Sequence, residues 1–197
     1  MISYRDYAEN IALLAMALKD ESLKDGAIIE CGTWRGGMAA GMIEVGGPER
    51  SYHFFDSFEG LPPVTKMDGK MGKEYESRLS SPGCAASLED FNETVSMAGC
   101  PKDKIFTYKG FFENTLPEFC PPKVAVLRID GDWYESTMIC LDKFWDSLLP
   151  GGLILIDDYH TWEGCSKAVH AFLAKREAPE TIREGELGRV GFIIKGF

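Results

Sequence analysis

The strongest constraint on the fold is an alternation of short apolar runs with segments of helical periodicity. Five apolar runs have the length of β-strands: 27–31, 52–56, 105–109, 124–130 and 153–157. Helical segments are predicted at 38–45, 87–98, 136–149 and 164–177. Strands that are apolar on both faces and alternate with helices are typical of a parallel sheet covered by helices on both sides. The sequence therefore predicts an α/β fold.

The two ends of the chain add elements that this alternation does not contain. Runs at 181–184 and 190–195 flank the short loop GELG, which indicates an antiparallel hairpin at one edge of the sheet. Within residues 1–26, apolar side chains recur at helical spacing and predict an N-terminal helix that packs on the core. This stripe consists of Tyr7, Ile11, Leu14 and Leu18.

The length of 197 residues indicates one domain, residues 1–197. Residues 62–86 show no clear periodicity and contain several Gly, Pro and Ser residues. A loop this long in a compact domain is usually a lid, a binding loop or disordered. We therefore treat 62–86 as a candidate lid loop.

Charge and cysteine content exclude several classes of partner. With 21 basic and 31 acidic residues, the formal net charge is −10. Such a charge repels phosphate backbones and anionic lipids, so neither nucleic acid nor a membrane is an expected partner. No apolar run is long enough to span a bilayer, and the N-terminal region lacks the basic leader of a signal peptide. The six cysteines form no CxxC pair, which favours a reduced, cytoplasmic protein.

Acidic residues stand at or next to the ends of four of the five predicted parallel strands. They are Glu30, Asp56, Asp130, and Asp157 with Asp158. In an open parallel sheet, ligands bind beyond the carboxyl ends of the strands, so these side chains are expected at one ligand-binding edge.

The turn after the first strand, ECGTWRGG at residues 30–37, suits a small ligand that carries a positive charge. Its glycines predict that a ligand approaches the backbone closely. The G-x-G-x-x-G spacing of a dinucleotide site is absent and Glu30 would repel a pyrophosphate, which argues against a nicotinamide-dependent dehydrogenase. S-adenosylmethionine has an ammonium group and no phosphate, and Asp56 could accept hydrogen bonds from its ribose hydroxyls. Ordinary strand-end carboxylates are the alternative interpretation of Glu30 and Asp56.

Asp130, Asp157 and Asp158 follow two strands that are predicted to be neighbours in the sheet. Three carboxylates offer only oxygen ligands, which suit a hard divalent cation, Mg²⁺ before Ca²⁺. Turn and helix-cap aspartates are the alternative interpretation. His160, two residues past the acidic pair, is a candidate base, ligand or substrate contact, or a solvated loop residue.

Longer motifs resemble the macrocin O-methyltransferase family, whose members methylate sugar hydroxyls on macrolides and aminocoumarins. The matching stretches are ECGTWRGG (30–37), DSFEGLPP (56–63), KGFFENTLP (109–117), VLRIDGDWYEST (126–137), LPGGLILIDDY (149–159) and GCSKAVHAF (164–172). The resemblance implies a class I methyltransferase fold. This Rossmann-like fold has a seven-stranded, mostly parallel sheet with an antiparallel C-terminal edge hairpin.

The resemblance also implies site residues by their positions in these motifs. The implied S-adenosylmethionine-binding residues are Glu30, Gly32, Thr33, Trp34, Arg35, Gly36 and Gly37 at the methionine end, Asp56 and Ser57 at the ribose, and Gly110, Phe111 and Phe112 by the adenine. The implied ligands of a Mg²⁺ cofactor are Asp130, Asp157 and Asp158.

The expected function is S-adenosylmethionine- and Mg²⁺-dependent O-methylation of a small molecule, on a sugar hydroxyl of a glycosylated natural product. A sugar hydroxyl is a very weak acid, so a base is needed; Asp130 is the expected one, with Asp132 and His160 as further candidates. The alternatives are a Mg²⁺-dependent phenol or catechol O-methyltransferase and a binding protein that kept the fold without the activity. Because relatives self-associate, a homo-oligomer, specifically a dimer, is expected.

Overall fold

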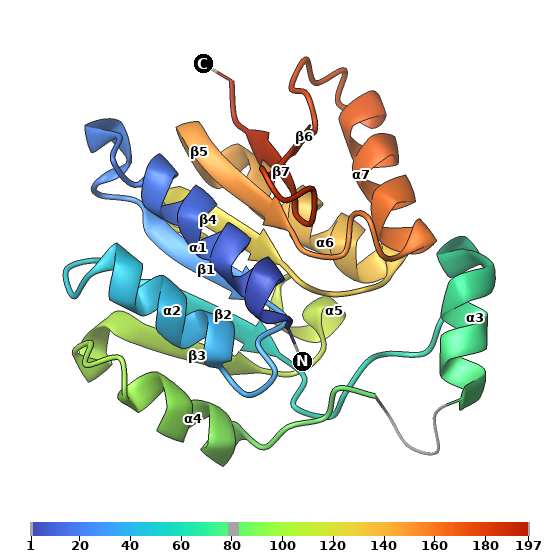
Figure 1. Cartoon of the computed structure of the whole chain (residues 1–197), viewed down its shortest axis with the longest axis horizontal. Coiled ribbons are helices and arrows are strands. Elements are labelled where there is room, and N and C mark those ends of the chain that lie inside the picture. Colours follow the sequence, from blue (N-terminus) through green and yellow to red (C-terminus); the bar gives the residue numbers. More distant parts are fainter. Residues whose placement is uncertain (1, 79–82, 197) are drawn as a thin grey trace.

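A computed structural model describes residues 2–78 and 83–196, and they build a seven-stranded sheet in the order β3-β2-β1-β4-β5-β7-β6 (Figure 1). The strands are β1 Ala27–Cys31, β2 Tyr52–Asp56, β3 Ile105–Lys109, β4 Val124–Ile129, β5 Leu148–Ile156, β6 Arg183–Glu184 and β7 Gly191–Ile194. Strands β1 to β5 pair in parallel, whereas β7 runs antiparallel to both β5 and β6. The predicted sheet, with its antiparallel C-terminal edge hairpin, is confirmed.

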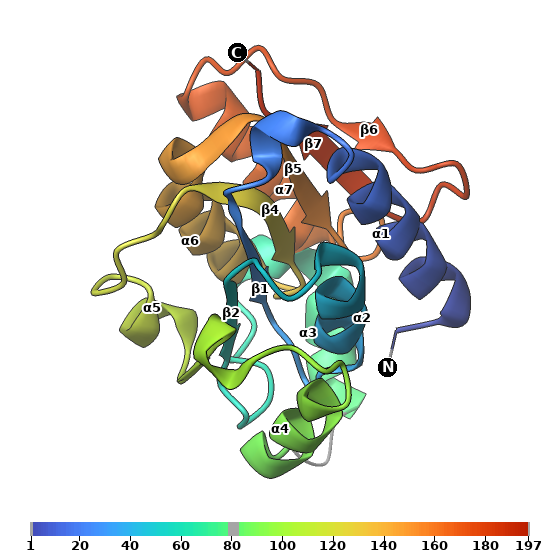
Figure 2. The same ribbon diagram turned by 90° about the vertical axis from the view of Figure 1, so that its left-hand side faces the viewer.

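Helices cover both faces of this sheet, as Figures 1 and 2 show from two sides. One face carries α1 Tyr4–Ala17, α2 Gly37–Gly46 and α4 Leu88–Ser96, and the other carries α5 Phe112–Thr115, α6 Tyr134–Phe144 and α7 Glu163–Lys175. The sheet separates two apolar clusters, and the strands contribute side chains to both. In β2, for example, Phe54 packs in one cluster and its neighbour Phe55 in the other. No helix among the described residues is long and apolar enough to cross a membrane.

The boundary between α6 and β5 differs from the prediction. The predicted helix 136–149 ends at Phe144, a short 3₁₀ turn η4 Trp145–Ser147 follows, and β5 already begins at Leu148. Trp145 and Leu148 continue the apolar helical spacing, which is why the predicted helix ran too far. The predicted strand started too late because Pro150 and two glycines resemble a turn, although residues 148–156 form one strand.

The candidate lid loop 62–86 contains more regular structure than its sequence predicts. It holds the 3₁₀ turn η2 Lys66–Asp68 and the ten-residue helix α3 Gly69–Arg78, while residues 79–82 of the predicted loop lie outside the described residues. Helix α3 contains two glycines and few apolar residues, so it has no clear helical periodicity. In Figure 1 it stands at the edge of the molecule, beside the start of α7.

Two acidic side chains attach this segment to the rest of the fold. Asp68 is buried, and its carboxylate accepts hydrogen bonds from the backbone N–H of Thr65 (2.6 Å) and of Tyr134 (2.7 Å), the first residue of α6. Glu163, the first residue of α7, accepts a hydrogen bond from the N–H of Lys70 in α3 (3.0 Å). The beginning of the segment is therefore tied to the N-terminal ends of α6 and α7, and movement of the segment as a lid stays a prediction.

Candidate active site

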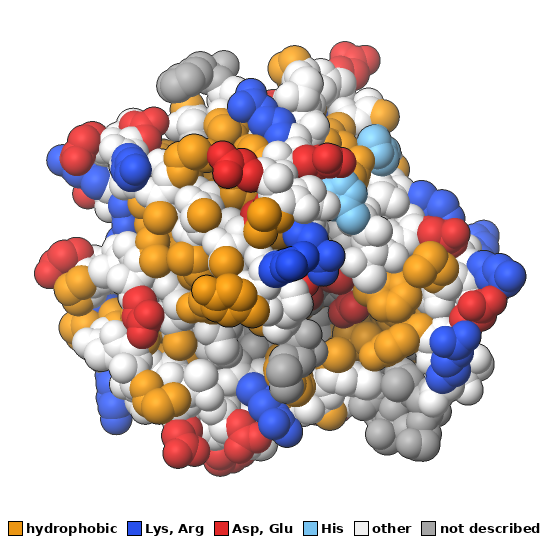
Figure 3. Space-filling view, in the orientation of Figure 1, with side chains coloured by type: hydrophobic (Ala, Val, Ile, Leu, Met, Phe, Trp, Pro, Cys, Tyr) orange, Lys and Arg blue, Asp and Glu red, His pale blue; other side chains and the backbone are white. Residues whose placement is uncertain are grey.

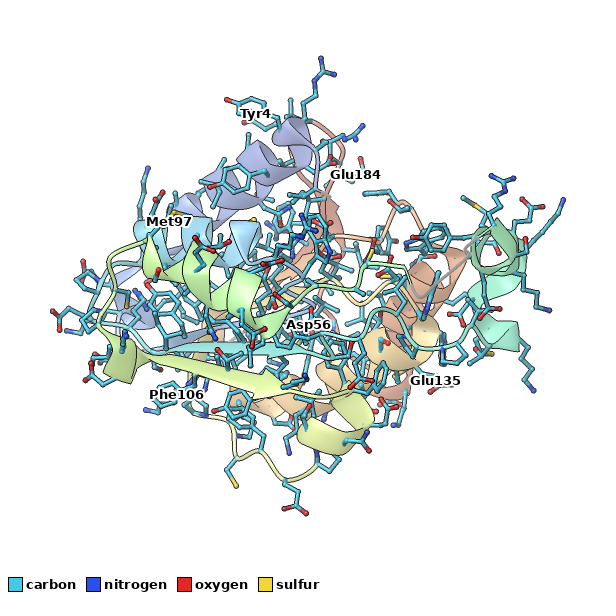
Figure 4. All side chains as sticks on the ribbon, turned by 90° about the horizontal axis from the view of Figure 1, so that it is seen from below. Tyr4, Asp56, Met97, Phe106, Glu135 and Glu184 are labelled. Carbon is cyan, nitrogen blue, oxygen red and sulfur yellow. The ribbon has the colours of Figure 1, made fainter. Side chains whose placement is uncertain are left out.

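The carboxyl ends of β1, β2, β4 and β5 surround a cavity of about 470 Å³. All the site residues predicted from sequence line it, except Gly36, Gly110 and the further candidate His160. Figure 3 shows acidic atoms recessed below the surface near the middle of one face, and in Figure 4 Asp56 lies toward the middle of the view, with Met97 and Phe106 toward its edge. The volume falls within the range of small-molecule sites.

Asp56, at the end of β2, holds the turn that follows β1. Its Oδ2 accepts hydrogen bonds from the backbone N–H groups of Thr33 (2.7 Å) and Trp34 (2.8 Å), and its Oδ1 accepts one from Phe58 (2.7 Å). A carboxylate has about four acceptor positions, so one position on Oδ1 is left for a ligand hydroxyl. Asp56 therefore fixes the loop, and its remaining acceptor position on Oδ1 can accept a hydrogen bond from a ribose hydroxyl.

The three glycines of the first turn lie in different surroundings. Gly32 has a φ of +91°, and a Cβ there would collide with the carbonyl oxygen of Asp130, so the end of β4 is what approaches this backbone. A Cβ at Gly36 would lie 2.9 Å from the Phe91 ring. Only Gly37 combines open space within 4 Å with a place in the cavity wall. Gly32 and Gly36 are therefore needed for packing within the protein, whereas close approach of a ligand to the backbone of this turn stays a prediction.

Arg128 is the residue that sequence reasoning missed. It is buried inside β4, in register with Glu30 of β1, and one of its terminal nitrogens binds carboxylate oxygens of Glu30 (2.8 Å) and Asp130 (2.9 Å). The other forms an ion pair with Asp157 (2.7 Å), and Asn10 of α1 donates a hydrogen bond to the same Asp157 oxygen (3.0 Å). The available signal was an arginine inside the apolar run VAVLRI, because a buried charge needs a partner.

Glu30 combines this ion pair with an unused acceptor. Its side chain is fully buried, and Oε2 has no hydrogen-bond partner among the described residues. Burial raises the pKa of Glu30 to about 8, although the positive charge of Arg128 opposes the shift. A buried carboxylate beside the cavity, with one oxygen lacking a partner among the described residues, fits a positively charged ligand group nearby, which would favour its charged form.

Asp130, Asp132 and Asp158 form a carboxylate cluster in the same cavity wall, next to Glu30, because Arg128 binds both Glu30 and Asp130. One oxygen from each lies within 4.8 Å of the others. Burial is the main cause that raises the pKa of all three, to about 7 for Asp132, and repulsion among the carboxylates adds to it. Three crowded oxygen donors fit a hard divalent cation, which would relieve this repulsion. The structure thus brings together two of the three predicted metal ligands and adds Asp132, while Asp157 is held by Arg128.

The remaining predicted residues divide between the cavity and its surroundings. Phe111 and Phe112 line the cavity, and Gly110 donates its backbone N–H to the carbonyl oxygen of Asp56 (2.9 Å). His160 does not line the cavity, and its Nε2 lies 3.8 Å from a carboxylate oxygen of Glu184 in β6. The structure therefore gives His160 no position from which to act as the base.

A sheet in this strand order, with a glycine-containing turn after β1 and a carboxylate at the end of β2, defines a class I methyltransferase fold. The chain belongs to the macrocin O-methyltransferase family, because the family model described as Macrocin-O-methyltransferase (TylF) matches residues 9–188.

Relatives of known activity support this assignment. The chain is 33% identical over 163 residues to the 8-demethyl-8-(2,3-dimethoxy-alpha-L-rhamnosyl)-tetracenomycin-C 4'-O-methyltransferase of Streptomyces olivaceus, covering 81% of this chain and 62% of that protein. It is 32% identical over 177 residues to the mycinamicin III 3''-O-methyltransferase of Micromonospora griseorubida, covering 84% of this chain and 68% of that protein. The chain therefore spans about two thirds or less of the length of these relatives.

Among solved structures, the fold matches the O-methyltransferase NovP with a TM-score of 0.81 and 25% sequence identity. The match covers 96% of this chain and 80% of that chain.

Proposed function

We propose that this chain is an S-adenosylmethionine-dependent O-methyltransferase that methylates a hydroxyl group on the sugar of a glycosylated natural product. The observation that carries the proposal is one cavity with two chemically different, adjoining parts, which we call its donor end and its acceptor end. A glycine-containing turn with an orphaned Glu30 oxygen forms one end, and three crowded aspartates form the other. The relative from Streptomyces olivaceus is named for a rhamnosyl-bearing substrate, which supports the acceptor class.

The donor end binds S-adenosylmethionine through the residues of the first turn. S-adenosylmethionine supplies the methyl group on a sulfonium. Glu30 would favour the ammonium group of the donor by its negative charge, and Arg128 holds Glu30 in place through Oε1. The remaining acceptor position of Asp56 meets the ribose, and Phe111 and Phe112 lie by the adenine.

Asp130 and Asp158 would hold Mg²⁺ at the acceptor end, with a carboxylate oxygen of Asp132 within 4.8 Å of theirs. When bound, the cation supplies a Lewis acid that makes an acceptor hydroxyl more acidic. Asp157, the third ligand predicted from sequence, pairs with the Arg128 guanidinium and accepts a hydrogen bond from Asn10, so we assign it the part of balancing the buried arginine. These residues also orient the acceptor, because neighbouring hydroxyls of a sugar suit a chelating site.

Asp132 is the proposed proton acceptor in preference to Asp130. One oxygen of Asp130 already accepts a hydrogen bond from Arg128 (2.9 Å), and a bound guanidinium makes a carboxylate a weaker base. Asp132 lines the cavity and has no such positive partner among the described residues. We expect Asp132→Asn to lower turnover by ~10²–10⁴-fold, the usual contribution of a general base.

The deciding experiment is methyl transfer from labelled S-adenosylmethionine to a panel of acceptors. The panel contains rhamnosides and other sugars with vicinal diols, set against catechols and simple phenols. Transfer to the glycosides, lost on removal of divalent cations with EDTA and restored by Mg²⁺, is the expected result. Faster transfer to catechols would replace the sugar by a phenolic acceptor, and donor binding without transfer to any acceptor would indicate a binding protein.

We also propose a homodimer, which rests on the resemblance alone. Light scattering of the purified chain measures its mass against the 21.9 kDa of one copy. A mass of one copy at micromolar concentration contradicts this proposal and leaves the chemistry untouched.

A further inference from the structure

Asp132 is held in an unusual backbone conformation. Its φ is +58°, and the N–H of Trp133 donates to the carbonyl oxygen of Gly131 (2.6 Å), which makes Asp132 the centre of a three-residue turn. A γ-turn with a positive φ at its centre is rare and strained. Such strain persists only where surrounding contacts hold it.

Two contacts hold Asp132 from outside the turn. Its backbone N–H donates to Oδ2 of Asp158 (3.0 Å). Its side-chain Oδ1 accepts a hydrogen bond from the indole Nε1 of Trp162 (2.7 Å). The second contact leaves only Oδ2 of Asp132 without a partner among the described residues, and it sets the rotation of the carboxylate in the cavity wall.

Trp162 is itself fixed by aromatic neighbours. Its ring lies edge-to-face against Trp133 (centroids 5.1 Å apart) and against Tyr75 of α3 (5.2 Å apart). Such pairs stabilise a defined ring orientation by about 0.5–1.5 kcal/mol beyond the area they bury. Trp162 also stands directly before Glu163, which binds the start of α3, so the indole is positioned by both α3 and α7.

We propose that Trp162 is a positioning residue that holds the Asp132 carboxylate in the orientation needed to take the proton of the acceptor hydroxyl. This inference deepens the proposed function and rests on it. Trp162 does not line the cavity, so its effect on the reaction passes through Asp132.

Trp133 provides the matched control for this role. It belongs to the same aromatic cluster, but its indole N–H donates to the carbonyl oxygen of Pro62 (2.9 Å). Trp162→Phe and Trp133→Phe each keep an aromatic ring in the cluster and each lose one indole donor. A packing role predicts similar losses for the two variants, whereas the positioning role predicts a loss specific to Trp162.

The first test measures rates with the acceptor that the wild type methylates. We expect Trp162→Phe to lower kcat at least tenfold, with acceptor KM and donor affinity within threefold, and Trp133→Phe to change kcat less than threefold. In an Asp132→Asn background, Trp162→Phe should change the residual rate less than twofold, because the group through which it acts is gone. Equal losses in the two phenylalanine variants, or a further tenfold loss on top of Asp132→Asn, overturn the inference.

The second test needs no turnover. Protein labelled with ¹⁵N at the indoles of its four tryptophans gives one Nε1–H signal for each, and Trp162→Phe assigns the relevant one. Asp132→Asn should move the Trp162 signal upfield and leave that of Trp145 in place, and an unmoved Trp162 signal overturns the inference. A wild type that binds the donor but methylates no acceptor overturns the proposed function itself, a result that the two positioning tests cannot produce.

Discussion

The two ends of the cavity use carboxylates in opposite ways. Asp56 receives three backbone N–H groups within 2.8 Å, so most of its hydrogen-bonding capacity is used inside the protein. At the other end, Asp130, Asp132 and Asp158 crowd together and repel one another. A carboxylate whose acceptor positions are mostly filled by backbone N–H groups fixes the shape of a loop. Crowded carboxylates repel one another and are stabilised by a bound positive charge. We infer that the first end is a preformed donor site and the second is completed only by a cation and an acceptor.

The largest effect is expected from a substitution in the carboxylate cluster of the acceptor end. Asp158→Asn should lower turnover at least ~1,000-fold, because it removes several kcal/mol of metal-assisted stabilisation. Donor affinity, measured by calorimetry, should stay within threefold, because the donor end is not touched. Glu135→Gln removes an exposed acid of α6 and serves as the control, with no change expected. A fully active Asp158→Asn variant would remove the cluster from the mechanism.

The next largest effect is expected from a substitution of Asp56 at the donor end. Asp56→Ala leaves three backbone N–H groups without their acceptor, and one such group costs about 1–3 kcal/mol when buried. We expect a loss of ~2–4 kcal/mol in the free energy of unfolding and a loss of at least ~30-fold in donor affinity. Urea unfolding and calorimetry measure the two quantities. Asp56→Asn keeps one acceptor oxygen and should fall between wild type and Asp56→Ala; equal affinity in all three proteins would contradict the anchoring role.

The pH dependence of stability separates the two ends without any substrate. In the metal-free protein, burial raises the folded-state pKa of Asp132 to about 7 from an ordinary value of 3.8. The favourable contribution of protonated Asp132 to the free energy of unfolding is therefore complete below pH 4, and it is lost as the pH rises through 7. A shift of this size corresponds to at most ~4 kcal/mol.

The measurement is urea unfolding in EDTA at pH 5 and at pH 8, for wild type and Asp132→Asn. We expect the variant to gain stability relative to wild type on going to pH 8, by up to a few kcal/mol. Mg²⁺ at pH 8 should restore stability to wild type more than to the variant. An identical pH dependence in both proteins would show that the cluster is not under electrostatic strain.

The smallest expected effect tests a single contact of the donor end. The indole N–H of Trp34 donates to the carbonyl oxygen of Ala85 (3.2 Å), which joins the first turn to the end of the candidate lid segment. Because a neutral hydrogen bond contributes about 0.5–1.5 kcal/mol, Trp34→Phe should weaken donor binding by about two- to twelvefold and leave kcat unchanged. A loss in kcat with unchanged donor affinity would instead assign Trp34 to the acceptor end.

The strands and the acidic edge were predictable because they rest on strong local patterns. Apolar runs such as 27–31 and 52–56 can be buried only as strands of a covered sheet, and the topology of parallel sheets brings their ends together. The boundary after Phe144 was not predictable, since Trp145 and Leu148 fit a helix as well as the observed turn and strand. Helix α3 has no local signal, because contacts of Asp68 and Glu163 with distant residues hold it.

Within the site, the types of residue were predictable but their partners were not. Sequence spacing cannot show that Arg128 forms an ion pair with Asp157, or that the carboxylate of Asp132 lies beside those of Asp130 and Asp158. That division depends on the register of β1 with β4 and on a positive φ at Asp132, and both are properties of the folded chain. For the same reason, our proposal takes Asp132 as base in place of Asp130, which the sequence predicted, and pairs Asp157, a metal ligand predicted from sequence, with Arg128.

The most direct test of the account is a crystal structure with Mn²⁺ in place of Mg²⁺ and with S-adenosylhomocysteine in place of the donor. Anomalous density should show one ion bound by carboxylate oxygens of Asp130 and Asp158, with the sulfur of the ligand in the same cavity. Anomalous density absent from the cluster at saturating Mn²⁺, with the three aspartates turned away from one another, would contradict the metal-assisted mechanism.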